Sequence, residues 1–446
     1  MHFLCKNIVI NYIAGDFMLL EFRVGNFRSI RDIQTLSLVA STDKAHIDTH
    51  IEQTGISASL KALKSAVIYG ANASGKTSVL MALDYMRAVV AESASVIQPG
   101  QTYNVQRFKL DESLEGKPTS FEVNFVRDGL RYEYSFQMTQ TRFFSESLYL
   151  YRTARPTLIF SREFDGEKDV YEFGTYLTGP KKIWEESTRS NALFLSTAAQ
   201  LNSEILSPIF KWLTSNIVFL PAQALINTAF STALLGTKEG QDSVKSFMAT
   251  ADISIDEIST VERKEKGFTF QFNPNAAPHT TQEEREFKVP VFKHTAPKGS
   301  ATFDLNEEST GTQRLFALAA PVLDVLREGR VLVIDELDSS LHPLLVRQLI
   351  GMFHNSGINK NNAQLVFSTH DTSLLDQSIF RRDQVWFTEK DSDQATNLYP
   401  LTDFSPRKNE ALEKGYLMGR YGAVPFFKEI PSLLINEHEK SSEKVD

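Results

Sequence analysis

The stretch Gly70-Ala71-Asn72-Ala73-Ser74-Gly75-Lys76-Thr77 matches the pattern G-x-x-x-x-G-K-[ST] and decides the fold. The apolar run 66–69 before it predicts a short buried strand, and the apolar residues spaced from Val79 to Val90 predict an amphipathic helix after it. Strand, glycine-rich loop and helix therefore follow in the order that a phosphate-binding loop requires. An ordinary glycine-rich turn is the alternative, and the match in this context argues against it.

Each residue type in this loop has a chemical reason to bind a nucleoside triphosphate. The glycines let backbone N–H groups turn toward phosphate oxygens, and Lys76 can reach the β and γ oxygens. The Thr77 hydroxyl can ligate Mg²⁺, and the helix N-terminus adds positive potential. The residues expected to hold ATP in this loop are Gly70, Asn72, Ala73, Ser74, Gly75, Lys76, Thr77 and Ser78.

A second motif is the apolar run 330–334 followed by two carboxylates, Asp335 and Glu336. Asp335 is expected to hold the Mg²⁺ shell together with Thr77, and Glu336 is expected to polarise the attacking water as a catalytic residue. A Glu directly after the Asp favours an ATPase with a carboxylate base over a GTPase that orients water with Gln. A plain acidic turn after a strand is the alternative, which the phosphate loop in the same chain weakens.

Two further segments flank this strand. Ser309-Thr310-Gly311-Thr312-Gln313 precedes an apolar helix, expected from 315 to 326 with an interruption at Pro321. A helix that begins with a small hydroxyl residue and a glycine presents unpaired N–H groups, so it is a second phosphate-binding end. The buried strand 364–368 leads to His370. Taken alone, the first segment would be a helix cap and His370 an ordinary histidine at a strand end.

The order of these segments resembles the ATP-binding head of ABC-type ATPases. The resemblance implies that Ser309, Gly311 and Gln313 belong to the signature, with Thr310 in place of its first glycine. It also implies that Asp338 is the D-loop residue and that the catalytic switch histidine, which contacts the γ-phosphate, is His370. Gln106 is the best candidate for the Q-loop glutamine, which the pattern does not place firmly.

The N-terminal run 20–32, with Asn26-Phe27-Arg28-Ser29, is similar to the opening of the branch that contains the chromosome-maintenance proteins, the RecF-type repair ATPases and the OLD-family nucleases. In that branch the base at the position of Arg28 approaches the nucleotide. Residues 191–196 and 415–425 resemble bacterial abortive-infection ATP-binding proteins of the AAA family, to which the AriA ATPase of the PARIS anti-phage defence system is similar.

The resemblance spans residue 18 to about 428 and implies partners as well as chemistry. It implies a homodimer, or a higher homo-oligomer, in which two heads sandwich ATP, and a separately encoded effector such as a nuclease or TOPRIM-type protein. Asp391-Ser392-Asp393 is followed by only 53 residues, too few for a TOPRIM domain within this chain. The alternatives kept open are a RecF-like DNA-repair clamp and a nucleotide-gated scaffold with little turnover.

The expected fold class is α/β: a P-loop head with a mixed central sheet flanked by helices, antiparallel edge hairpins and a helical or mixed insertion. Lys76 and Asp335 are 259 positions apart, so the core is split, and the lack of sustained heptads predicts no long coiled coil. Alternating runs around Asp128-Gly129 predict a hairpin. The expected divisions are an extension from an upstream start (1–17), the N-terminal ATPase lobe (18–140), an insertion subdomain (141–300), the C-terminal ATPase lobe (301–436) and a charged tail (437–446).

Composition adds what the motifs leave out. The 446 residues are 42% apolar and 23% charged, which predicts a soluble, cytoplasmic protein without a membrane span. A net charge of −8 gives no overall steering toward nucleic acid, although contact of a local surface with DNA stays open. The single cysteine, Cys5, excludes a disulfide within the chain.

Overall fold

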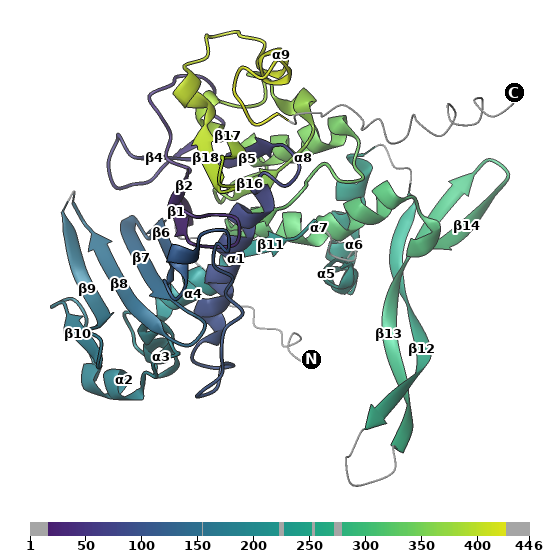
Figure 1. Ribbon diagram of the computed structural model, residues 1–446. Coiled ribbons are helices and arrows are strands. Elements are labelled where there is room, and N and C mark those ends of the chain that lie inside the picture. Colours follow the sequence, from purple (N-terminus) through teal and green to yellow (C-terminus); the bar gives the residue numbers. More distant parts are fainter. Residues whose placement is uncertain (1–16, 154, 223–226, 252–254, 272–278, 425–446) are drawn as a thin grey trace, which may run out of the picture.

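Two large β-sheets with their helices form the body of the molecule, and a long β-hairpin projects from it (Figure 1). The structure is a computed structural model that describes residues 17–153, 155–222, 227–251, 255–271 and 279–424. The seven-stranded sheet is antiparallel throughout, whereas the six-stranded sheet is parallel except for its last strand. A mixed central sheet beside an antiparallel sheet confirms the expected α/β head.

The antiparallel sheet grows from successive hairpins. The turn between its strands β6 and β7 is formed by Asp128 and Gly129, which have φ angles of 52° and 69°. Asp and Gly tolerate these left-handed conformations, so the predicted hairpin is confirmed at the predicted turn. In spatial order the strands are β10 (Asp169–Phe173), β9 (Pro156–Phe164), β8 (Phe143–Tyr151), β7 (Leu130–Met138), β6 (Thr119–Arg127), β1 (Phe17–Gly25) and β2 (Gln34–Ser37).

The mixed sheet is buried on both faces, as a parallel sheet requires. Alternate residues of its strands belong to two different hydrophobic clusters: Ile68 and Val333 to one, Val67 and Leu332 to the other. Because β5, β15 and β16 run parallel, the segments that follow them meet at one edge of the sheet. In spatial order the strands are β11 (Ile217–Leu220), β15 (Val331–Ile334), β16 (Gln364–Ser368), β5 (Ser65–Gly70), β17 (Val385–Lys390) and β18 (Thr396–Pro400).

Helices cover both faces of the mixed sheet. The first cluster joins the antiparallel sheet to α1 (Lys76–Glu92), α2 (Lys181–Ser187), α3 (Phe194–Gln200) and α4 (Ser207–Ser215). The second cluster holds α7 (Thr310–Glu328), α8 (Pro343–His354) and α9 (Leu412–Leu417). The expected interruption at Pro321 is wrong, because α7 continues through this residue. The helix tolerates the proline with the help of the Ser231 hydroxyl, which accepts a hydrogen bond from the backbone N–H of Ala320 (3.1 Å).

The projecting arm consists of β12 (Glu257–Gln271), β13 (His279–Ala296) and β14 (Gly299–Asp304). It follows two short helices, α5 (Ala229–Leu234) and α6 (Lys238–Ala249). Sequence patterning predicts one strand over 268–272, whereas β12 is far longer and residue 272 lies outside the described residues. The described side chains at 261–264 are all exposed, so no apolar alternation marks this part of the strand.

The expected domain boundaries differ from the observed architecture. The boundary between residues 140 and 141 falls between β7 and β8, which pair with each other in one sheet. The range 141–300 also includes β11, a strand of the mixed sheet. Spacing between motifs cannot reveal such pairings, because hydrogen bonds of a sheet connect strands irrespective of their distance along the chain. The first sixteen residues and the tail 437–446 lie outside the described residues, and β1 already includes Phe17.

Small elements complete the chain: β3 (Ile51–Gln53), β4 (Lys61–Leu63) and the 3₁₀ helices η1 (Glu112–Leu114), η2 (Leu305–Glu307), η3 (Thr372–Leu374), η4 (Arg382–Gln384) and η5 (Leu401–Phe404). Asp391 and Asp393 lie between β17 and β18 and pair with Arg31, which makes this segment a structural turn. In the described part of the chain, no helix combines the length and apolar character that crossing a bilayer demands.

The two segments that resemble abortive-infection proteins have packing roles. The Asn191 side chain donates to the carbonyls of Gln98 and Gln101, and the residues after it begin α3 beneath the antiparallel sheet. Tyr416 and Tyr421 are buried in the second cluster, and the Tyr416 hydroxyl donates to the Ala423 carbonyl (3.0 Å). Both segments therefore contribute to the core, up to the last described residue at 424.

Candidate nucleotide-binding site

The loop between β5 and α1 has a backbone that suits glycine. Gly70 and Gly75 have φ angles of 157° and 112°, and Ala73 lies in the left-handed region with φ 62°. A Cβ atom on Gly75 would lie 2.1 Å from Thr396 Oγ1, so a side chain would not fit at this position. Gly75 is the N-cap of α1 and gives it no side-chain cap, which leaves the first N–H groups of the helix available to an anion.

Hydroxyl groups from distant parts of the chain form hydrogen bonds that hold this loop in place. Ser74 Oγ lies 2.6 Å from Thr388 Oγ1 on β17, and Thr396 Oγ1 on β18 donates to the Ser74 carbonyl (2.9 Å). Ser29, in the N-terminal turn, donates to Ser78 Oγ (2.8 Å) and lies 2.9 Å from Thr396 Oγ1. The phosphate loop is therefore fixed by three other segments.

Lys76 is a buried cation whose hydrogen bonds go to the loop itself. Its Nζ donates to the carbonyls of Gly70 (2.8 Å) and Ala71 (3.2 Å). Burial lowers the pKa of Lys76 to about 8, although the charges of Asp335 and Glu336 oppose the shift. Within the described chain, no carboxylate lies at ion-pair distance from Nζ. A phosphate oxygen would give this charge the partner that it lacks.

Asp335 receives two hydroxyl hydrogen bonds at the end of β15. Thr77 Oγ1 donates to its Oδ2 (2.8 Å), and Ser368 Oγ donates to its Oδ1 (2.5 Å). The same Ser368 oxygen accepts from the backbone N–H of Glu336 (2.8 Å). A hydroxyl and a carboxylate side by side are ligands that Mg²⁺ uses together with water and phosphate oxygens, so Thr77 and Asp335 fit that ion.

Three further predicted residues surround this cluster. Glu336 follows Asp335 with a left-handed backbone (φ 53°), and its charge acts on both Lys76 and His370. The Asp338 carboxylate accepts from the backbone N–H of His370 (3.2 Å). Burial and the nearby Lys76 lower the pKa of His370, with the carboxylates opposing the shift. A neutral imidazole therefore lies beside the loop at neutral pH.

The residues predicted to form the signature lie at the start of α7. Ser309 is the N-cap of α7, where its Oγ accepts from the backbone N–H of Thr312 (3.1 Å), and the Gln313 side chain donates to the Glu308 carbonyl (2.8 Å). A Cβ on Gly311 would lie 3.2 Å from the carbonyl oxygen of Ser340, so the helix start packs against the D-loop. None of Ser309, Gly311 and Gln313 has a described hydrogen bond to residues 70–78.

Arg28, predicted to approach the nucleotide, has no described hydrogen bond to residues 70–78. Its backbone, with φ 51°, donates from N–H to the Gln106 carbonyl (2.7 Å), and its guanidinium contacts the Met81 sulfur on α1. Gln106 itself is exposed and, like Arg28, makes no described contact with Lys76. In this turn it is the neighbour, Ser29, that reaches the loop.

Sequence reasoning missed four residues of the site. Ser29 and Ser368 lie within segments that were recognised, and Ser368 is two positions before His370, which is the one signal that could have identified it. Thr388 and Thr396 lie more than 300 positions after the loop and belong to no motif. Only the pairing of β17 with β5 and of β18 with β17 brings them to the loop.

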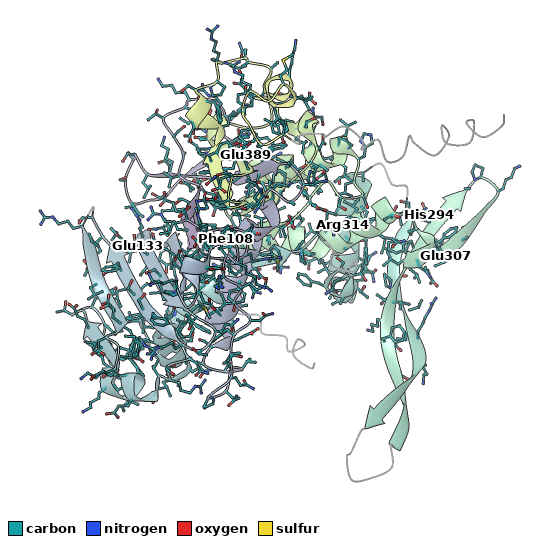
Figure 2. All side chains as sticks on the ribbon, viewed as in Figure 1. Phe108, Glu133, His294, Glu307, Arg314 and Glu389 are labelled. Atoms are coloured by element: carbon teal, nitrogen blue, oxygen red, sulfur yellow. The ribbon has the colours of Figure 1, made fainter. Side chains whose placement is uncertain are left out.

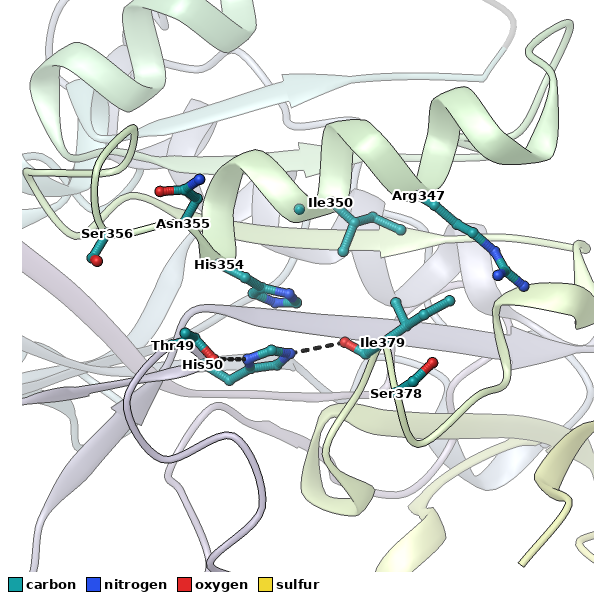
Figure 3. A pocket seen from close by; sticks show the side chains of 10 residues that line it. Thr49, His50, Arg347, Ile350, His354, Asn355, Ser356, Ser378 and Ile379 are labelled. Carbon is teal, nitrogen blue, oxygen red and sulfur yellow. Dashed lines mark hydrogen bonds between the residues drawn. The ribbon is translucent and has the colours of Figure 1, made fainter. Parts of the chain in front are cut away.

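A separate pocket of about 430 Å³ lies between α8 and the segments around residues 50 and 379 (Figure 3). The imidazoles of His50 and His354 stack there with centroids 3.6 Å apart, and His50 Nε2 lies 2.9 Å from the Ile379 carbonyl oxygen. Burial lowers the pKa of His50 to about 4 and holds the pKa of His354 well below its usual value, so both rings are neutral at neutral pH. No residue predicted to bind nucleotide lines this pocket.

Comparison with known families identifies the chain. Residues 65–376 match the family described as "AAA domain, putative AbiEii toxin, Type IV TA system", and the chain belongs to this family. The match includes the phosphate loop, the signature, the Asp335 strand and His370. No curated protein matches the chain.

Several solved structures show weak similarity. The head domain of SMC from Thermotoga maritima has 12% identity and a TM-score of 0.38, covering 86% of this chain and 98% of its own. The SMC head bound to the C-terminal winged-helix domain of ScpA has 11% identity and a TM-score of 0.38, with coverages of 86% and 97%. The recombination mediator RecF with ATP has 14% identity and a TM-score of 0.35, with coverages of 86% and 98%.

Proposed function

We propose that this protein is an ABC-type ATPase that works as a molecular switch, binding and hydrolysing ATP. The observation that carries the proposal is the contact between two motifs 258 positions apart, the hydrogen bond from Thr77 Oγ1 to Asp335 Oδ2. It places a hydroxyl, a carboxylate and the buried Lys76 at the uncapped N-terminus of α1. Membership of an AAA family supports the same chemistry.

Each group of the cluster has a distinct task. Lys76 and the N-terminus of α1 bind and neutralise the phosphates, while Thr77 and Asp335 would hold Mg²⁺, which supplies further charge neutralisation when bound. Glu336 orients and polarises the attacking water, and the neutral His370 contacts the γ-phosphate side of the site. The Asp338 carboxylate accepts a hydrogen bond from the backbone N–H of His370, which connects the D-loop to the histidine.

The active form is a dimer in which two heads bury two ATP molecules between them. The phosphate loop of one copy faces Ser309, Gly311 and Gln313 of the other. Two observations support this arrangement: α7 begins at the surface with exposed Ser309, and the signature residues make no described hydrogen bond to the phosphate loop of their own chain. Binding of ATP closes the dimer and hydrolysis opens it again.

The biological role proposed here is that of the sensor or ATPase component of a bacterial anti-phage system, as in AriA of the PARIS system. The description of the family, which names an AbiEii toxin and a type IV toxin–antitoxin system, supports a defence protein with a separately encoded partner. The proposed partner is a nuclease or TOPRIM-type effector encoded as a second protein. A RecF-like clamp and a scaffold with little turnover are the competing functions.

One experiment separates these functions. The purified protein is assayed for ATP hydrolysis with and without DNA, and Glu336→Gln is used to trap the ATP-bound state. A switch hydrolyses ATP, and an effector that senses it binds the trapped and nucleotide-free forms with different affinity. Strong stimulation by DNA, with no partner recovered from the native host and unchanged phage sensitivity in a Lys76→Ala strain, would support the repair clamp. Tight ATP binding with negligible turnover would support the scaffold.

A further inference from the structure

Arg314 is a buried cation that the proposed chemistry does not use. It lies in the second turn of α7, directly after the signature residues (Figure 2). Its exposed fraction is 7%. Among the residues that the structure describes, its Nε and Nη2 are buried without any hydrogen-bond acceptor. Burial lowers the pKa of Arg314, and the one charge that opposes this shift is the carboxylate of Glu336.

The other deeply buried arginines of the described chain are paired. Arg162 and Arg381 are each 1% exposed, and each lies 2.7–2.8 Å from an aspartate oxygen. A guanidinium cannot release its proton at physiological pH, and leaving a buried ion without a partner destabilises the fold. Arg314 therefore carries a cost that the fold avoids at the two comparable positions. Such a cost is tolerated where another state of the molecule supplies the partner.

Glu336 is the group that can become this partner. Its backbone N–H is held by Ser368, but its carboxylate has no hydrogen bond or ion pair among the described residues. The start of α7 packs against the D-loop at Gly311 and Ser340, four residues after Glu336. A shift of α7 against the D-loop therefore changes the separation between Arg314 and the Glu336 carboxylate.

We propose that Arg314 is a positioning residue that pairs with the Glu336 carboxylate when the heads close around ATP, and that it thereby links the signature helix to the group acting on water. The inference rests on the proposed ATPase function. In the open state the guanidinium is held ready and unpaired. In the closed state it fixes one oxygen of Glu336 and leaves the other for the attacking water. Engagement of Ser309 and Gly311 by a second copy would then be sensed directly at the hydrolytic site.

The proposal predicts opposite effects on stability and on turnover. Arg314→Met keeps a long side chain of similar length but removes the unpaired charge, so the nucleotide-free protein should be as stable as the wild type or more stable. The same variant should lower kcat at least about tenfold, because a misplaced reacting group costs up to about a hundredfold. The Kd for ATP should stay within about twofold of the wild type, since Arg314 has no described hydrogen bond to the phosphate loop.

The test compares wild type, Arg314→Met, Arg314→Lys and a control, Arg327→Met, which removes an exposed arginine on the same helix. Thermal unfolding without nucleotide, ATP affinity and kcat are measured for each. The proposal expects kcat to fall in Arg314→Met, to be partly restored in Arg314→Lys and to be unchanged in Arg327→Met. An Arg314→Met protein that keeps wild-type kcat, or that unfolds more readily without nucleotide, overturns the proposal.

Controls keep this result apart from the proposed function. If the wild type neither binds nor hydrolyses ATP, the ATPase assignment itself fails. If the wild type hydrolyses ATP and Glu336→Gln does not, while Arg314→Met matches the wild type, only the role of Arg314 fails. Loss of ATP binding in Arg314→Met would place the arginine in nucleotide binding and would also contradict a positioning role.

Discussion

The start of α1 and the start of α7 are both helix N-termini of the kind that bind phosphate, yet they are built differently. Gly75 gives α1 no side-chain cap, and contacts from β15, β17, β18 and the N-terminal turn hold its loop. Ser309 caps α7, and the hydrogen bonds around it stay within five residues along the chain. In the proposed composite site, the half formed by the phosphate loop is held by its own chain, whereas the half formed by the signature residues begins at the exposed Ser309.

This difference indicates which half of the proposed site depends on pairing of two copies. A helix end with free N–H groups, a buried lysine and a fixed carboxylate can bind phosphate in a single copy. A capped helix end has already satisfied part of its own hydrogen-bonding capacity. In the proposed dimer, the nucleotide that reaches this helix end is bound by the other copy. Substitutions in the first half should therefore act on ATP itself, and substitutions in the second half should act on pairing.

The largest effects are expected from substitutions in the half formed by the phosphate loop, Asp335 and Glu336. Glu336→Gln removes the carboxylate that polarises water, so turnover should fall by about 10²–10⁴ while ATP binding is kept.

Lys76→Ala should weaken ATP binding, because it removes the buried cation from the phosphates. Turnover and nucleotide affinity are measured with Glu204→Gln and Lys360→Ala, at exposed positions, as controls. Wild-type turnover in Glu336→Gln would remove Glu336 from the mechanism.

The second prediction concerns the half of the proposed site that Ser309, Gly311 and Gln313 form. Ser309→Arg places a bulky cation at the start of α7, so each monomer should still bind ATP but ATP-dependent pairing should be lost. Light scattering with and without ATP measures this, with Ser59→Arg as an exposed control. Mixing Ser309→Arg with Lys76→Ala leaves one intact composite site in each mixed dimer, so part of the ATPase activity should return. Undiminished ATPase in a protein shown to be monomeric contradicts the composite site.

A smaller effect on kcat is expected from Ser368, which supports Asp335 and Glu336 by hydrogen bonds. Ser368→Ala removes the hydrogen bonds to Asp335 and to the Glu336 backbone, so kcat should fall by about 10–100-fold, as for other groups that orient metal ligands. Ser196→Ala, which removes a buried hydroxyl bonded to the Val90 carbonyl away from the site, is the matched control. Equal kcat losses in the two variants would show that Ser368 acts only through general stability.

The smallest effect depends on pH. With a pKa of about 8, Lys76 loses its proton in the empty site above that pH, and phosphate binding requires the charged form. The Kd for ATP should therefore rise up to about tenfold per pH unit above about pH 8, with uptake of a proton on binding. Calorimetry in buffers of different ionisation heat measures the proton. Lys76→Arg should lose this dependence, because arginine stays charged.

The sequence predicted the phosphate loop and the Asp335 strand end because the patterns that mark them extend over only a few residues. The glycines at 70 and 75 mark backbone conformations that side chains disfavour, and Asp335-Glu336 marks a strand end at the edge where parallel strands present their ligands. The arm and the domain boundaries were harder, since exposed strands carry no apolar alternation and a sheet joins segments without regard to spacing.

By itself, the sequence predicted which residues bind a nucleoside triphosphate, and it determined the order of the motifs and the hairpin closed by Asp128-Gly129. Those properties follow from residue chemistry and from conformational preferences over a few residues. Only the tertiary structure decided that Thr388, Thr396 and Ser29 brace the loop. It also decided that Arg314 Nε and Nη2 are buried without an acceptor among the residues that the structure describes. The physical reason is that such contacts depend on how strands pair and helices pack, which brings together residues that no local pattern connects.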